Sequence, residues 1–140
     1  MSDARVETQD GGDLRAILLI VYGLFVLATF NGATAIAGVV LAYIKRDAAR
    51  GTIWESHVRN IIHVFWITLF VAIVALAILL QAFGGLAVSL IATNGNPSPV
   101  LIGWLIALAP VFWLGAVIFL VWYLYRTLRG LVRTIESQPY

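Results

Sequence analysis

The sequence contains a run of 66 residues, from Asn60 to Tyr125, without a single charged side chain. A second uncharged run of 29 residues extends from Ala16 to Ile44. A helix needs about 20 apolar residues to cross the hydrocarbon core of a bilayer, which is about 30 Å thick. The longer run is therefore sufficient for two membrane crossings, and the shorter run for one crossing or a tight pair of helices.

The composition agrees with a lipid environment. Apolar residues make up 61% of the chain, against roughly 45–50% in soluble proteins. In lipid every backbone polar group must be hydrogen-bonded within the protein, which only helices and closed barrels achieve. The apolar runs lack the alternating pattern of a barrel strand. We therefore predict an all-α fold, a polytopic transmembrane helical bundle surrounded by the lipid bilayer.

The polarity of the chain divides it into three parts. Residues 1–13 are polar and have too few apolar side chains to pack, so they predict a flexible N-terminal tail. Residues 14–125 form the predicted transmembrane helical domain. Residues 126–140 form a basic amphipathic tail that is expected to lie along anionic lipid. Three arginines share one helix face of this tail and are assigned to the membrane surface: Arg126, Arg129 and Arg133.

The first uncharged run also has features of a signal peptide, because a small-residue stretch follows its apolar part at Ala33–Ala35. A signal peptide has a positively charged leading end. Here the leading segment holds four acidic residues against two arginines, so cleavage is not expected.

The dipeptide Asn31-Gly32 interrupts this run and is a typical turn sequence. One continuous helix over residues 14–44 would be about 46 Å long, which exceeds the bilayer core. We therefore predict four helices in total, of which the first two form a short hairpin. One long tilted helix in place of the hairpin, giving three spans, is the alternative.

Small residues recur every four positions in the second half of the predicted hairpin, at Thr34, Gly38 and Ala42. Small side chains let two helix backbones approach closely, which drives helix association where lipid supplies no hydrophobic force. This face is therefore predicted to pack against protein.

The segment 45–60 is predicted to be a docking surface next to the membrane. Thr52 and Glu55 have the spacing of a capping box, so a helix is expected to begin there. Glu55 and Arg59 have the spacing of a helical ion pair. Nine residues are assigned to docking or packing: Thr34, Gly38, Ala42, Asp47, Glu55, Ser56, His57, Arg59 and Trp66.

Two further spans are predicted, from Ile61 to Phe83 and from Val100 to Tyr125, with a Gly, Asn and Pro-rich turn between them. Pro110 in the last span predicts a kink. Aromatic residues near the two ends of this span are expected to form an aromatic belt at the headgroups: Trp104 at one end and Trp122, Tyr123 and Tyr125 at the other.

Cations in the short connections predict the orientation. The connection 45–60 holds four Lys or Arg residues and the tail after Tyr125 holds three, whereas the loop 84–98 holds none. Because cytoplasmic loops are enriched in Lys and Arg, the C-terminus is predicted to be cytoplasmic. With the hairpin, the N-terminus is on the same side.

Residues 42–66, from AYIKRDAA through SHVR to Phe65-Trp66, resemble a family of small bacterial inner-membrane proteins. That family looks distantly similar to the twenty-kilodalton channel component of the chloroplast inner-envelope protein translocon. The resemblance implies a bacterial inner-membrane location, four helices and no established biochemical activity. The chain departs from the family pattern at Ile61, His63 and Val64, where a polar residue, a cation and Thr are more usual.

The chemistry-bearing residues do not form a catalytic set. There is no cysteine, and His57 and His63 point about 120° apart on one helix, so they are not expected to share a metal. No charged residue lies within a predicted span, where ion-coupled transporters retain one. The sequence therefore predicts no enzyme activity, no cofactor or metal site and no nucleic-acid binding.

The functional hypothesis is a non-enzymatic integral membrane protein that acts by helix packing and through segment 45–60. It would work as a homo-oligomer or as an accessory subunit of a larger membrane assembly. The alternative is a small pore, or a channel component for small solutes or for protein translocation. Its polar path would be lined by Thr34, Thr68, Gln81 and Ser89.

Overall fold

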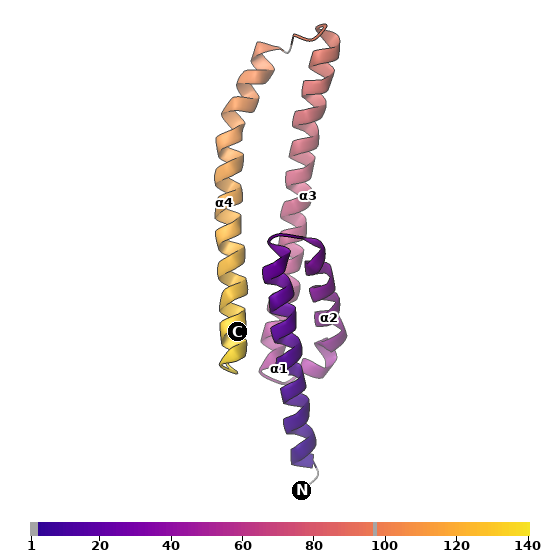
Figure 1. Ribbon diagram of the computed structural model, residues 1–140, viewed down its shortest axis with the longest axis vertical. Helices are drawn as coiled ribbons and strands as arrows, with labels where there is room; N and C mark the ends of the chain where they lie inside the picture. The colour runs from indigo at the N-terminus through magenta and orange to yellow at the C-terminus, as the bar shows by residue number, and fades with distance from the viewer. Residues whose placement is uncertain (1–2, 97) are drawn as a thin grey trace. The chain divides into compact units, whose positions relative to one another are not determined.

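The structure is a computed structural model that describes residues 3–96 and 98–140, with side chains described from Gly12 onward. The described residues form four α-helices and contain no strand: α1 (Asp3–Ala28), α2 (Ala33–Ala49), α3 (Trp54–Ala92) and α4 (Pro99–Ile135), as Figure 1 shows. The prediction of an all-α fold with four helices is confirmed.

The chain divides into two compact units. Unit 1 consists of Met1–Ile67 and Trp122–Tyr140, and so contains α1, α2, the beginning of α3 and the end of α4. Unit 2 is Thr68–Val121, the rest of the two long helices and the turn between them.

In unit 1, α1 and α2 pack side by side as an antiparallel hairpin (Figure 1). The small-residue face of α2 provides the close approach. A Cβ atom on Gly38 would lie 2.8 Å from the ring of Phe25 in α1, and Ala42 is buried. The face is therefore a packing face, as predicted, but it is occupied within the chain and is not free for another protein.

The helices extend further toward the N-terminus than the sequence predicts. The helix α1 begins at Asp3, where a flexible tail over residues 1–13 was expected. Good helix formers between Asp3 and Asp10, such as Ala, Glu and Gln, explain the extension. At the other end, α4 continues without interruption from Pro99 to Ile135, so residues 126–135 of the predicted amphipathic tail are a helical extension of the last long helix.

The core of unit 1 follows the helical period. In α1 the buried apolar residues include Leu14, Leu18, Val21 and Phe25, spaced three or four apart, and in α3 they include Val58, Ile61 and Val64, again spaced three apart. Full burial of one such side chain stabilises a fold by about 1.5–3 kcal/mol. Hydrophobic burial therefore accounts for the association of these helices, and it leaves the polar groups between them to be hydrogen-bonded.

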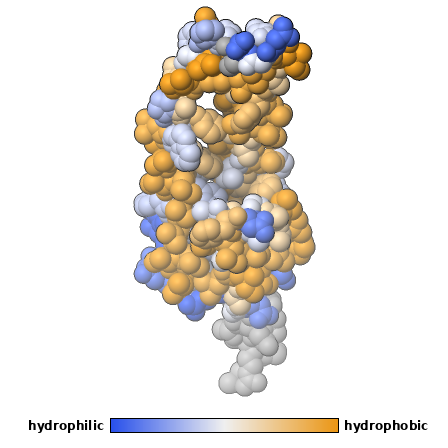
Figure 2. All heavy atoms as spheres, turned by 45° about the horizontal axis from the view of Figure 1, so that its top comes forward, coloured by the Kyte–Doolittle hydropathy of each residue, from blue (hydrophilic) through white to orange (hydrophobic). Residues whose placement is uncertain are grey.

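Unit 2 has almost no core of its own. Its two helices run antiparallel and are joined by a turn, where the Ser98 N–H donates to Ser89 Oγ at 3.0 Å. Both α3 and α4 are long and apolar enough to cross a membrane, and none of the most apolar stretch of α4 is buried. Hydrophobic residues form most of the face in Figure 2. The exposed side chains of unit 2 include Phe70, Ile73, Phe83, Trp104, Val111 and Trp113.

We predict that Gly38→Ala destabilises the hairpin while Gly23→Ala does not. Both glycines lie inside helices, so both variants gain similar helix propensity. Only the Cβ at Gly38 meets the buried Phe25 ring, since nothing lies within 4 Å of a Cβ at Gly23. Thermal unfolding followed by circular dichroism in detergent should separate the two variants by about 1–3 kcal/mol. Equal stabilities would contradict this packing.

Candidate functional site

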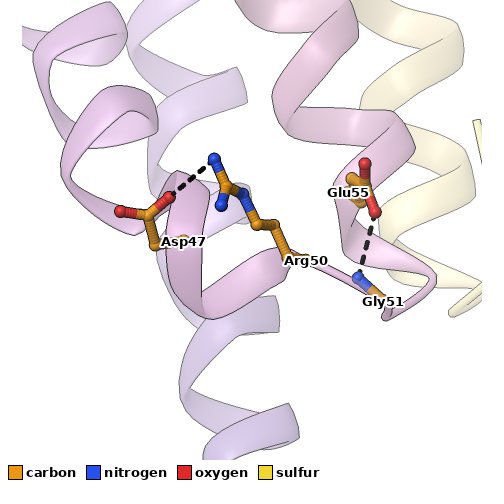
Figure 3. Close-up of polar contacts among 4 residues, drawn as sticks. All are labelled: Asp47, Arg50, Gly51 and Glu55. Carbon is orange, nitrogen blue, oxygen red and sulfur yellow. Dashed lines mark hydrogen bonds and ion pairs between the residues drawn. The ribbon is translucent and has the colours of Figure 1, made fainter.

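The turn between α2 and α3 is built largely as the sequence predicts. The Trp54 N–H donates to Thr52 Oγ1 at 3.2 Å, and the Gly51 N–H donates to Glu55 Oε2 at 3.0 Å (Figure 3). The two side chains predicted for a capping box both bond to the backbone here, but each bond is displaced by one residue, with the hydroxyl at the Trp54 N–H and the carboxylate at the Gly51 N–H. Gly51 has a φ of 74°, which lets the chain reverse here.

The predicted ion pair between Glu55 and Arg59 is wrong. Within the described residues the ion pair of this segment is between Arg50 Nη2 and Asp47 Oδ1, at 3.3 Å (Figure 3). The Glu55 carboxylate is held by the backbone of the turn instead. A backbone donor that is otherwise unbonded competes well with an exposed ion pair, which contributes little in water.

His57 was predicted to belong to an exposed docking surface. This prediction is wrong, because His57 is fully buried in unit 1. Its Nδ1 atom lies 3.2 Å from the Tyr22 hydroxyl of α1 and 3.2 Å from the Thr134 hydroxyl of α4. Its Nε2 atom lies 2.8 Å from the carbonyl oxygen of Gln138. The imidazole therefore joins three helices and the segment that follows α4.

The hydrogen-bond partners of His57 indicate which of its two ring nitrogens carries the hydrogen. A carbonyl oxygen only accepts, so Nε2 carries the hydrogen and donates to Gln138. The Thr134 hydroxyl donates to the carbonyl oxygen of Gly130 at 2.8 Å, which leaves the Tyr22 hydroxyl to donate to Nδ1. With one ring nitrogen donating and the other accepting, the bonds fit a neutral imidazole.

The chain of hydrogen bonds continues from Tyr22 to α4. Asn60 Nδ2 donates to the Tyr22 hydroxyl at 3.4 Å, and Arg126 Nε donates to Asn60 Oδ1 at 2.7 Å. All the donors point the same way, from Arg126 through Asn60, Tyr22 and His57 to the Gln138 carbonyl. We call these five residues the buried polar chain. Hydrogen bonds in series polarise one another, so the set acts as one cross-link between α1, α3 and α4.

Close backbone contacts hold Tyr22 in this chain. The Tyr22 ring packs directly on Gly130 of α4, so closely that a Cβ at that position would overlap the ring. One turn further along α1, the Phe25 carbonyl oxygen accepts a hydrogen bond of 2.6 Å from the buried Tyr123 hydroxyl. Tyr123 therefore packs within the helical unit and does not belong to the predicted aromatic belt.

The residues after α4 fold back onto α3. Ser137 has a φ of 55°, and the Gln138 N–H donates to the Arg133 carbonyl at 2.9 Å, which are marks of a Schellman cap. The Tyr140 N–H then donates to Ser56 Oγ at 3.0 Å. The Tyr140 ring lies edge-on to His57 and over the Arg126 guanidinium.

The three arginines that were assigned to the membrane surface have different surroundings in the structure. Arg126 turns inward to Asn60 and is part of the buried polar chain. Arg133 Nη1 donates to the Pro139 carbonyl at 2.9 Å and holds the returning segment. Only Arg129 is exposed in the predicted manner, with Nη1 donating to the exposed Tyr125 hydroxyl at 3.2 Å.

A pocket of about 200 Å³ lies on unit 1 between α2 and α3. Arg46 and Arg50 of the α2 side and Arg59 of α3 line it. We call it the basic pocket; its other lining residues are Tyr43, Glu55, Val58 and Ile62. Neither Arg46 nor Arg59 forms an ion pair or a side-chain hydrogen bond with any described residue.

The structure brings together some of the predicted docking residues. Arg59 and Glu55 meet at the basic pocket, whereas Asp47 is exposed beside it and bonded to Arg50. Trp66 is exposed, and its Nε1 donates to the Tyr43 hydroxyl at 3.0 Å. Thr34 is at the hairpin turn, where its hydroxyl lies 3.0 Å from the carbonyl oxygen of Leu24.

Reasoning from the sequence did not identify Tyr22 or Asn60 as members of the buried polar chain. Tyr22 was counted only as part of an uncharged run, and Asn60 as the last residue of segment 45–60. A signal was present, because the hydroxyl of a tyrosine within an apolar helix needs a partner when the ring is buried. That argument does not say which of the other helices supplies the partner.

No set of described side chains resembles a metal centre, since no group of three or more His, Asp or Glu residues comes together in them. No known protein family matches the chain, and no characterised protein or solved structure is significantly similar to it. The resemblance carried by residues 42–66 gains no support from these comparisons. The functional argument therefore depends on the geometry alone.

We predict that Tyr22→Phe destabilises unit 1 much more than Tyr125→Phe. The first change leaves the buried His57 Nδ1 and Asn60 Nδ2 without the shared hydroxyl, whereas the second removes an exposed contact. Loss of a partner by a buried polar group costs about 1–3 kcal/mol. Thermal unfolding measures this cost, and equal stabilities of the two variants would contradict the hydrogen-bonding role of Tyr22.

The direction of the hydrogen bonds is tested on the unaltered chain, where nitrogen NMR of the His57 imidazole should report the Nε2–H tautomer. An Nδ1–H tautomer would overturn the assigned direction of the buried polar chain.

Proposed function

We propose that this chain is a non-enzymatic integral membrane protein that crosses the bilayer twice with unit 2 and works as a docking subunit. The observation that carries the proposal is the bare apolar surface of unit 2. Soluble monomers rarely expose contiguous apolar patches larger than a few hundred Å². Here α3 and α4 are each long enough to cross, and their parts in unit 2 carry no charge and leave nearly all of their large apolar side chains uncovered. Lipid or another membrane protein covers such a surface.

The charges support one orientation. All nine Lys and Arg residues of the sequence fall in the residues of unit 1, and none falls in unit 2 or its turn at residues 93–98. By the positive-inside rule the segments of unit 1 lie on the cytosolic side, here the cytoplasmic side of a bacterial inner membrane. Two crossings return the chain to the side from which it started. The C-terminal segment is then cytoplasmic, next to the beginning of α3 that it contacts.

The hairpin of α1 and α2 enters the bilayer from that side without crossing it. The apolar part of α2, Ala33–Ile44, is about 18 Å long at 1.5 Å per residue, shorter than the core of about 30 Å. A turn in lipid needs its backbone donors bonded internally. The N–H groups of Phe30 and Asn31 both donate to the carbonyl of Leu27. Outward-facing apolar residues, including Ile20, Leu27, Phe30, Ile36 and Val40, supply a surface for acyl chains.

The docking role follows from what remains exposed. Because the small-residue face of α2 is occupied by α1, assembly with a second copy or with another membrane protein uses the apolar helices of unit 2 and the exposed segment 45–60. A pore is the alternative hypothesis. Two of the four side chains expected to line it bond to the backbone instead: Thr34 at the hairpin turn and Ser89 at the unit 2 turn.

The membrane topology is testable with single cysteines, because the natural sequence has none. We expect Asn94→Cys to react with an impermeant maleimide from the periplasmic side only, and Ser137→Cys from the cytoplasmic side only. Val74→Cys and Val117→Cys, inside the two crossings, should stay unlabelled in intact vesicles. Recovery of the chain in the supernatant after an alkaline carbonate wash, or labelling of Val117→Cys, would overturn the membrane proposal.

Assembly is tested separately on the unaltered chain. In mild detergent, light scattering coupled to size exclusion should give a protein mass above that of one chain, 15.3 kDa, or a partner should co-purify from native membranes. A monomer that retains no partner would remove the docking role while leaving the topology intact. Flux across reconstituted liposomes that is lost in Gln81→Ala would favour the pore.

A further inference from the structure

The basic pocket gathers positive charge that the protein does not neutralise. Arg46 and Arg59 converge on it from α2 and α3, and neither guanidinium has a partner among the described residues. Bringing like charges together is unfavourable, and the cost is removed when an anion binds between them. Within the described residues no carboxylate fills that role.

The two acidic groups of this segment are committed elsewhere. Asp47 is paired with Arg50, and the Glu55 carboxylate accepts the Gly51 N–H, as the close-up in Figure 3 shows. Glu55 lines the basic pocket, but its bonded oxygen is directed at the turn. The lining of three arginines and one glutamate therefore keeps a net positive charge.

One wall of the pocket is apolar and leads toward the uncharged part of α3. Val58 and Ile62 lie one turn apart on α3 and line the pocket, and the next turn carries the exposed Trp66, bonded to Tyr43. Trp and Tyr with exposed rings are typical of the headgroup level of a bilayer. From Trp66 to Arg59 is about 10 Å along a helix, close to the depth of a headgroup layer.

We propose that the basic pocket binds the phosphate of an acidic phospholipid headgroup. Arg46 and Arg59 donate to the phosphate oxygens in the forked geometry that guanidinium groups favour. Tyr43 contributes a hydroxyl at the rim, and Val58, Ile62 and Trp66 flank the glycerol and the first carbons of the acyl chains. The inference rests on the membrane location proposed above.

The test uses the full chain in zwitterionic detergent, with phosphatidylglycerol, phosphatidylcholine and glycerol 3-phosphate as probes. Native mass spectrometry measures retained lipid, and thermal unfolding measures stabilisation. We expect phosphatidylglycerol to be retained and stabilising, and phosphatidylcholine and glycerol 3-phosphate to have little effect.

Two double variants separate the pocket from general charge. Arg46→Gln with Arg59→Gln removes two charges from the pocket, and Lys45→Gln with Arg129→Gln removes two charges outside it. The apparent affinity for phosphatidylglycerol should fall at least tenfold in the first and less than twofold in the second. Glu55→Gln keeps an acceptor for the Gly51 N–H but removes the negative charge, so it should raise the affinity at least twofold, a gain that misfolding does not produce.

Equal binding of phosphatidylcholine, equal losses in the two double variants, or unchanged affinity in Glu55→Gln would overturn the lipid site. Stabilisation by glycerol 3-phosphate equal to that by the lipid would also overturn it, because the ligand would then be a soluble phosphate compound. Membrane extraction of each variant is measured alongside. A chain that stays in the membrane but shows no lipid preference refutes the site alone, whereas a chain in the supernatant refutes the proposed function.

Discussion

The arrangement of the helices in unit 1 depends on the hydrogen bonds of the His57 imidazole. A buried polar ring is tolerated only when its nitrogens are hydrogen-bonded, and here the bonds come from Tyr22 of α1 and from the segment after α4, while Thr134 of α4 lies against the ring. Asn60 and Arg126 extend the same set of bonds to the other side of Tyr22. Hydrophobic burial brings the helices together, but it is nondirectional. The buried polar chain is what specifies their register.

Unit 2 has no such network of buried polar side chains among its described residues. It has no charged residue and little internal packing, so it would be poorly stable in water and adequately stable in lipid, where backbone hydrogen bonds within each helix suffice. The two units thus differ in how they are built: unit 1 has a specifically hydrogen-bonded interior, and unit 2 has an apolar exterior. The proposed lipid site lies on unit 1, where the positive charges of the chain are concentrated.

Much of the fold was predictable from the sequence because it follows local rules. The turn at Asn31-Gly32, the close approach at Gly38 within the hairpin and the start of α3 just after Thr52 each depend on residues that are near in the sequence. The candidate site was less predictable. Placing His57 on an exposed face assumed that polar residues at the start of α3 meet water, and nothing local indicates that Tyr22 and Gln138 cover it. Arg126 was misassigned for the same reason, since its partner Asn60 is distant in the sequence.

The return of the chain onto His57 has a consequence for biosynthesis. In the sequence, all of unit 2 lies between His57 and Gln138, so the imidazole cannot obtain its carbonyl partner until residue 138 has left the ribosome. During elongation the interior of unit 1 stays open after the apolar helices of unit 2 have already been synthesised. Closure of the interior is then a late step, and chains stalled before it would present an unbonded imidazole and tyrosine to cellular proteases.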